Sequence, residues 1–279
     1  MGKEKQIKLI PLTDEERKRV QGYELKILIE IHRICTKYNI RYSLAYGTLI
    51  GAVRHHGFIP WDDDVDICML REDYIKFKTI CKKELGSAFF YQSQDTDPEY
   101  FYLFDKIRLN GTIFKESFVS KYNIHHGVYI DIFPVDFIPD NYFLRKFQYC
   151  CFQFFRIGVQ AKYLMLNART GVKRYIFGFL RLFYFFIPLR FLYKTANQIA
   201  TWYDCKPCNR VMNFYTPYRT REIFNSQMYQ KYIRTVFENE EFCIVRDYDL
   251  FLHQIYGNYM ELPPKDQRCT RHTITELKL

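Results

Sequence analysis

The sequence predicts a mixed α/β fold with a mainly helical extension, and three observations support this. Over residues 1–140, segments with the 3.6-residue spacing of a helix alternate with short segments that have the period of a strand. Residues 141–242 differ, because aromatic and basic residues are frequent there and acidic ones are few as far as Tyr203. Residues 243–279 form a short C-terminal element, which we expect to pack back on the first part. A hydrophobic content of 48% over 279 residues allows a sizeable core.

An amphipathic helix is expected first, over residues 14–38. Thr13 and Glu16 have the spacing of a capping box, which satisfies free backbone amides at the start of a helix. Apolar residues follow at helical spacing, and they are Val20, Tyr23, Ile27, Leu28, Ile31, Ile34, Cys35 and Tyr38. We expect this apolar face to pack on the sheet.

The strands and further helices of the expected sheet follow in order. Arg41–Tyr46 alternates polar and apolar residues as a strand does, Gly47 ends it, and residues 48–54 can form a short helix. Val65–Leu70 is expected to be a second strand, and Arg71–Leu85 has the one-sided apolar spacing of a helix. Later strands are expected at Phe89–Gln92, Phe101–Arg108, Ile113–Lys115 and Val128–Phe133.

The extension contains the most apolar stretch of the chain, Ile176–Leu192. Arg181 and Pro188 interrupt it, so it lacks the roughly 20 consecutive apolar residues of a transmembrane helix. Two interpretations stay open. The stretch either lies on a membrane as an interfacial helix, or it forms core helices whose arginines reach out to water.

Charge and cysteine content narrow the partners and the compartment. A formal net charge of +10 favours phosphorylated substrates or anionic lipid, and without a run of five basic residues we expect no nucleic-acid partner. The nine cysteines are odd in number and lie mostly among apolar residues, which predicts reduced thiols. Since the N-terminus is also too polar for a signal peptide, we expect a cytoplasmic protein, with peripheral contact to the inner face of the cell membrane under the interfacial interpretation.

The segment from Tyr42 to Met69 contains the clearest chemistry. It begins with a strand that ends in a tight turn at Gly47 and Thr48. A glycine lets the backbone approach a phosphate closely, and the free amides that open the next helix favour an anion. Gly47 and Thr48 are therefore candidates for binding phosphate oxygens.

An acidic run follows that turn. If Asp62–Asp66 is extended, Asp62, Asp64 and Asp66 point to one face, while Asp63 and Val65 point to the other. Crowded carboxylates repel one another unless a divalent cation neutralises them. Mg²⁺ prefers oxygen ligands and shares its coordination sphere with substrate phosphates. The segment therefore predicts a site for a phosphate and Mg²⁺, or Mn²⁺ in its place.

A third carboxylate on a neighbouring strand would complete such a site. Asp131 is the best candidate, because it is a single acid in an otherwise apolar strand, and Asp136 is the alternative. Arg54, Lys106 and Arg108 are the basic candidates for the remaining phosphate charge.

Two stretches, YGTLIGAVRHHGFIPWDDDVDI and GVYIDIFPVD, closely resemble the LicD family. The resemblance implies a nucleotidyltransferase-like mixed sheet flanked by helices, and transfer of phosphocholine from CDP-choline to cell-surface polysaccharides. The fukutin-related proteins, which use CDP-ribitol, are similar to that family. The resemblance also makes Asp64 and Asp66 the metal-binding pair, Asp62 the preceding acid and Asp131 the third metal ligand.

The resemblance covers about residues 38–140 and 243–272. It includes a C-terminal element with Tyr256, Leu262, Pro263, Pro264 and Arg268, although Asn258 stands where the family commonly has an aspartate. The aromatic extension carries no motif of this kind. Residues 1–140 are then the expected catalytic core.

Together these features predict a metal-dependent transferase of phosphorus-containing groups. Its donor would be a CDP-linked alcohol, with phosphocholine as the first choice for the group transferred. Its acceptor would be a glycan or lipid-linked precursor of a lipopolysaccharide, teichoic acid or capsule. Asp131 or Asp62 would deprotonate the acceptor hydroxyl. A nucleotidyltransferase that uses an NTP and an inactive membrane-associated scaffold are the alternatives.

Overall fold

The computed structural model describes residues 9–163, 172–206, 208–270 and 272–279. The chain forms two compact units. Unit 1 comprises Met1–Tyr100, Asp105–Phe133 and Lys231–Leu279, and unit 2 comprises Phe101–Phe104 and Pro134–Gln230. Helices and strands occur in both units, so the predicted mixed α/β class is confirmed.

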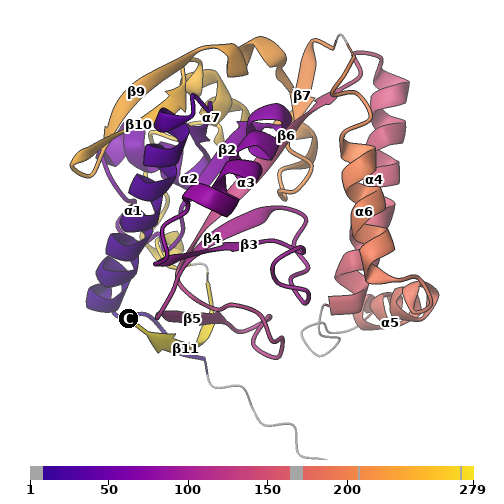
Figure 1. The fold of residues 1–279 in the computed structure, drawn as a ribbon, viewed down its shortest axis with the longest axis horizontal. Helices are drawn as coiled ribbons and strands as arrows, with labels where there is room; N and C mark the ends of the chain where they lie inside the picture. The colour runs from indigo at the N-terminus through magenta and orange to yellow at the C-terminus, as the bar shows by residue number, and fades with distance from the viewer. Residues whose placement is uncertain (1–8, 164–171, 207, 271) are drawn as a thin grey trace, which may run out of the picture. The chain divides into compact units, whose positions relative to one another are not determined.

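Unit 1 is built on a mixed sheet whose strands lie in the order β1, β2, β6, β4, β3 (Figure 1). Their bounds are Ser43–Leu44, Asp66–Leu70, Tyr129–Ile138, Asp105–Leu109 and Phe89–Gln92 in that order. β1 pairs antiparallel with β2, and β4 pairs antiparallel with both β3 and β6. Apolar side chains such as Ile67, Ile107 and Ile130 are fully buried and form the core of the unit.

Helices flank this sheet as predicted. α1 spans Asp14–Lys37 and begins at the expected capping box between Thr13 and Glu16. It packs against β4 and against α3, Arg71–Glu84. α2, Tyr46–Ile50, continues into the π-helical turn η1, Gly51–His55.

The end of the chain returns to unit 1. β9, Tyr232–Phe237, and β10, Glu240–Val245, form a hairpin, and the amide of Val245 donates to Ser43 Oγ on β1 over 3.0 Å. α7, Tyr248–Tyr256, packs on α2. The final strand β11, Ile274–Lys278, pairs with β5, Ile113–Glu116.

The described part of unit 2 includes the helices α4, α5 and α6 and the short strands β7 and β8. α4, Tyr142–Tyr163, and α6, Leu189–Ala200, run side by side, and α5, Val172–Tyr184, crosses one end of the pair (Figure 1). The strand β7, Arg210–Met212, pairs with the second half of β6 and with β8, Phe224–Asn225. Two 3₁₀ turns, Arg219–Glu222 and Ser226–Gln230, flank β8.

The apolar stretch Ile176–Leu192 is divided between α5 and α6 by a turn that ends at Pro188. Among the described residues, no helix combines the length and the apolar character that crossing a bilayer requires. Leu192, Ala196 and Ile199 of α6 are buried, as the core interpretation of this region predicts.

Three strand predictions have the wrong bounds. β1 is shorter than Arg41–Tyr46, because Tyr46 adopts a left-handed φ of 51° and already begins α2. Residues 101–104 lie outside β4 and belong to unit 2. β6 continues past Phe133 to Ile138, because Asp136–Ile138 find a pairing partner in β7.

Candidate functional site

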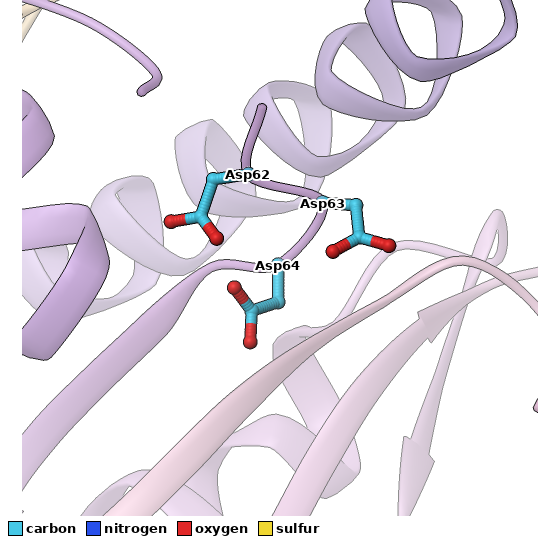
Figure 2. Close-up of side chains that lie close together, drawn as sticks. All are labelled: Asp62, Asp63 and Asp64. Atoms are coloured by element: carbon cyan, nitrogen blue, oxygen red, sulfur yellow. The ribbon is translucent and has the colours of Figure 1, made fainter. Parts of the chain in front are cut away.

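The acidic run converges in unit 1, although its geometry differs from the prediction. Carboxylate oxygens of Asp62, Asp63 and Asp64 all lie within 4.8 Å of one another (Figure 2). β2 begins only at Asp66, so these three residues are not part of a strand and need not alternate. The prediction assumed an extended strand over Asp62–Asp66, and the strand covers only its last residue, although Asp63 is buried while Asp62 and Asp64 are partly exposed.

Asp66 and Asp131 extend this cluster from two adjacent strands. Asp66 opens β2, and Asp131 lies in the first half of β6, where its amide donates to the carbonyl of Val65 over 3.0 Å. Burial raises the pKa of Asp66 well above its usual range, and the negative charges of Asp64 and Asp131 raise it further. The four predicted catalytic carboxylates, Asp62, Asp64, Asp66 and Asp131, thus lie close enough to interact electrostatically. All four are partly exposed.

Lys106 is the predicted cation that the fold brings to these acids. It is the register partner of Asp131, and its ammonium donates to Asp131 Oδ1 over 2.5 Å. The ammonium also lies 3.5 Å from the centroid of the Tyr129 ring. Burial raises the pKa of Asp131, and the charge and hydrogen bond of Lys106 counteract that rise without cancelling it.

Arg108 is placed differently. It is buried, and its guanidinium donates to the side chain of Gln92 and, over 2.7 Å, to the carbonyl of Gly127. These bonds tie β4 to its neighbours. They favour a structural role for Arg108 over a role in phosphate binding.

Arg54 also has a structural role, because it binds backbone carbonyls of the C-terminal element. From η1 it donates to the carbonyls of Tyr259 and Glu261 over 2.5 and 3.2 Å. Nearby, the guanidinium carbon of Arg268 lies 5.5 Å from the centroid of the Trp61 ring, next to the acidic run. The C-terminal element therefore supports the segment that leads into Asp62.

Gly47 and Thr48 lie against the acids, within the first turn of α2. A Cβ on Gly47 would lie 2.6 Å from Asp62 Oδ2, so only glycine allows this approach of the carboxylate. Thr48 Oγ1 accepts from the amide of Asp66 over 2.9 Å. The ring of Tyr46, which packs on Phe133 and Phe251, holds the start of the helix in place.

Sequence reasoning missed His272, which connects the acids to the end of the chain. Its Nδ1 lies 3.1 Å from Asp63 Oδ1, and its Nε2 lies 4.0 Å from Asp64 Oδ2 and 3.9 Å from Glu116 Oε1. Burial lowers the pKa of His272, but the hydrogen bond to Asp63 and the charges of Asp64 and Glu116 outweigh it and raise the pKa to about 10. His272 is therefore a cation at neutral pH.

Glu24 was missed as well. It lies on the buried face of α1, and Glu24 Oε2 has no hydrogen-bond partner in the described part of the chain. Burial raises the pKa of Glu24 well above its usual range, and the charges of Asp64, Asp63 and Asp62 add to the rise. Its position, four residues from both Val20 and Leu28, was the signal that it shares the apolar face.

Acidic groups outnumber cations at this site. Among the described residues, two cations, Lys106 and His272, share the region with seven carboxyl groups. These are Glu24, Asp62, Asp63, Asp64, Asp66, Glu116 and Asp131. Within the described ranges, one buried oxygen each of Glu24, Asp63 and Glu116 lacks a hydrogen-bond partner. Such a set of hard oxygen donors with excess negative charge fits a divalent cation such as Mg²⁺.

Comparison with known proteins places this site in a family. The chain is 30% identical over 261 residues to the lipopolysaccharide cholinephosphotransferase LicD of Haemophilus influenzae, covering 89% of this chain and 92% of that protein. The chain belongs to the LicD family. The predicted resemblance is thereby confirmed.

Two further similarities agree with membership of the LicD family. The family model described as the LicD/FKTN/FKRP nucleotidyltransferase domain matches residues 39–155, which include Asp62–Asp66, Lys106 and Asp131. The human and mouse ribitol 5-phosphate transferases FKRP are each 30% identical over 107 residues, which cover 38% of this chain and 19% of theirs. These relatives of the LicD family are all named as transferases of phosphate-containing groups.

Proposed function

We propose that the protein transfers a phospho-alcohol group, phosphocholine first among them, from a CDP-linked donor to a hydroxyl of a cell-surface glycan or its lipid-linked precursor. One observation carries this proposal. Asp62, Asp64, Asp66 and Asp131 converge in a chain that is similar, over nearly its whole length, to a lipopolysaccharide cholinephosphotransferase.

Asp64, Asp66 and Asp131 are the proposed ligands of Mg²⁺ or Mn²⁺. Asp131 would bind through the oxygen that does not accept from Lys106. The ion, when bound, supplies positive charge against the donor diphosphate and the leaving CMP. Asp62 and Asp63 are close enough to share in this site.

In the proposed reaction the acceptor oxygen bonds to the phosphorus that carries the alcohol. The bond from that phosphorus to the oxygen bridging to CMP breaks, and CMP leaves with the bonding electrons. A carboxylate takes the proton of the acceptor hydroxyl. Asp131 and Asp62 are the candidate bases. Asp62 lies in the acidic run without being one of the three proposed metal ligands, and Asp131 would need an oxygen that neither Lys106 nor the ion engages.

The donor phosphates would be held by groups of β4 and α2. Lys106 is the basic residue best placed for this, because its ammonium already lies beside Asp131. The amides of Gly47 and Thr48 would add donors on the other side of Asp62. Arg54 and Arg108 are less suited, because backbone carbonyls already engage their guanidinium groups.

The reducing compartment predicted from the sequence remains part of the proposal. All nine cysteines are free thiols in the structure, which suits a cytoplasmic protein. A lipid-linked acceptor would be met at the inner face of the cell membrane.

The release of CMP tests the proposal directly. Purified protein is incubated with Mg²⁺, an acceptor glycan and either CDP-choline, CDP-ribitol or CDP-glycerol, and CMP is measured. We expect metal-dependent release that is fastest with CDP-choline and lost in Asp64→Asn. Release of pyrophosphate from an NTP would instead identify a nucleotidyltransferase. If the folded protein released neither CMP nor pyrophosphate with any donor, the result would favour an inactive scaffold.

The contact between Gly47 and Asp62 gives a second test. Gly47→Ala places a methyl group against the carboxylate, which is expected to rotate away, lowering the rate of CMP release about tenfold with little loss of stability. Gly22→Ala is the matched control, because nothing lies within 4 Å of a Cβ at this exposed position of α1. It should leave the rate unchanged and raise the free energy of unfolding by about 0.5 kcal/mol. Equal rates in the two variants would remove Gly47 from the site.

A further inference from the structure

The outer face of α5 is unusually apolar for a helix in contact with water. It is formed by Tyr175, Ile176, Phe179, Leu182 and Phe183 of α5 and by Phe186 in the following turn. Tyr175, Phe179 and Phe186 expose 79%, 69% and 84% of their surface. We call these six residues the α5 face. A continuous set of large exposed rings marks an interaction surface.

The spacing of the residues shows that this exposure belongs to one side of the helix. Tyr175, Phe179 and Leu182 follow one another at steps of four and three residues, which places them in one stripe of α5, and the exposed Phe186 lies in the turn after the helix. Tyr184 lies about half a turn away from that stripe. The α5 face therefore has a defined direction.

Tyr184 fixes α5 to the rest of unit 2. It is buried, and its hydroxyl donates to the carbonyl of Phe154 on α4 over 2.9 Å. Its ring packs so closely on Gly158 that a Cβ there would lie 2.7 Å from it. Because Tyr184 faces α4, the stripe on the other side of α5 points away from it.

The charge of the surrounding chain identifies the kind of partner. From Asn141 to Tyr203 the sequence contains ten lysines and arginines and no aspartate or glutamate. Arg181 of α5 and Arg190 and Lys194 of α6 are exposed. A second copy of this chain would bring two such basic regions together, which electrostatic repulsion disfavours. An anionic bilayer offers both an apolar layer for the rings and negative charge for the basic side chains.

We propose that the α5 face docks on an anionic lipid bilayer, with α5 lying in the interface rather than crossing it. The rings of Phe179 and Phe186 enter the boundary of the acyl chains. Arg181 stays at the level of the lipid phosphates. For α5 the proposal adopts the interfacial interpretation, while the buried Leu192 and Ala196 favour the core interpretation for α6.

Vesicle flotation tests the proposal without any donor or acceptor. The full chain is mixed with vesicles of phosphatidylcholine alone, or of phosphatidylcholine with phosphatidylglycerol, at low and high salt. We expect binding to the anionic vesicles that weakens with salt, and much less binding to the neutral ones. Phe179→Ser/Phe186→Ser should lower the binding constant at least about tenfold. Its thermal unfolding should be unchanged, because both side chains are exposed.

The matched control is Ile75→Ser/Leu250→Ser, which removes two exposed apolar side chains from α3 and α7. This control should float with the vesicles like the parent protein. Absence of flotation in the parent, or equal flotation of the α5 variant, overturns the proposal. So does a concentration-dependent dimer in sedimentation that the α5 variant abolishes, because the α5 face would then bind a second copy. Since CMP release is not measured, failure here leaves the proposed function untouched.

Discussion

Asp66→Asn is expected to abolish transfer and, at the same time, to stabilise the metal-free protein. Burial raises the pKa of the Asp66 carboxyl well above its usual range, and the negative charges of Asp64, Asp131 and Asp62 raise it further. An amide of the same shape removes that repulsion, so the free energy of unfolding in EDTA should rise by about 1 to 2 kcal/mol. Loss of a metal ligand should lower the rate of CMP release at least about 10³-fold.

The response to metal separates the two effects. The proposed metal site exists only in the folded protein, so Mg²⁺ should raise the melting temperature of the parent protein. The melting temperature of Asp66→Asn should respond much less. Thermal unfolding in EDTA measures the stability of the metal-free protein, and thermal unfolding in Mg²⁺ measures the stabilisation by metal. CMP release measured on the same samples gives the activity.

Asp73→Asn is the control for Asp66→Asn. Asp73 is also buried, but it accepts from Arg41 Nε over 2.9 Å and from the amide of Arg41 over 3.2 Å. Its substitution should therefore destabilise the protein by about 1 to 3 kcal/mol and leave the rate per folded molecule unchanged. If Asp66→Asn instead destabilised the metal-free protein as Asp73→Asn does, the carboxylates would not be repelling one another.

The proposed catalytic carboxylates stand out in the sequence because each breaks a local rule. Asp131 is an acid in an apolar strand, and Asp64 and Asp66 crowd at the start of another. Such features are costly without a compensating ion, so they stand out in a single sequence. The structure brings their charges within reach of one another.

Glu24 and His272 could not be recognised so easily. Glu24 lies at the helical spacing of the apolar residues around it. The pattern therefore predicts the helix correctly without marking Glu24 as a member of a site. His272 lies in the segment before β11 and reaches the acids only because β11 pairs with β5, a contact between residues more than 150 positions apart. No local pattern contains that pairing.

The partners of the basic residues could not be predicted from the sequence either. Lys106 and Arg108 both point inward from the fully buried β4, and nothing in their spacing distinguishes their partners. In the structure, Lys106 meets a carboxylate and Arg108 meets a side-chain amide and a carbonyl. Which of the two cations can bind a phosphate depends on the groups that the neighbouring strands place beside it. The sequence alone does not show those groups.

His272→Ala is expected to destabilise the metal-free protein. It leaves Asp63, which is fully buried and has one oxygen without a hydrogen-bond partner, with no cation beside it among the residues that the structure describes. The free energy of unfolding in EDTA should fall by about 2 to 3 kcal/mol, at the lower end for a broken buried pair because the imidazole is partly exposed. His253→Ala removes a histidine from an exposed pair with Asp249 and should cost less than about 0.5 kcal/mol.

The contribution of His272 to stability should decrease as the pH rises. Because folding raises the pKa of His272 from 6.5 to about 10, the folded state holds this proton more tightly than the unfolded state. The stabilisation is complete below pH 6.5 and is lost as the pH rises towards about 10. Chemical denaturation in EDTA across that window should show stability falling in the parent protein and in His253→Ala, and falling much less in His272→Ala. Equal slopes in all three proteins would mean that His272 is not the cation that holds these carboxylates together.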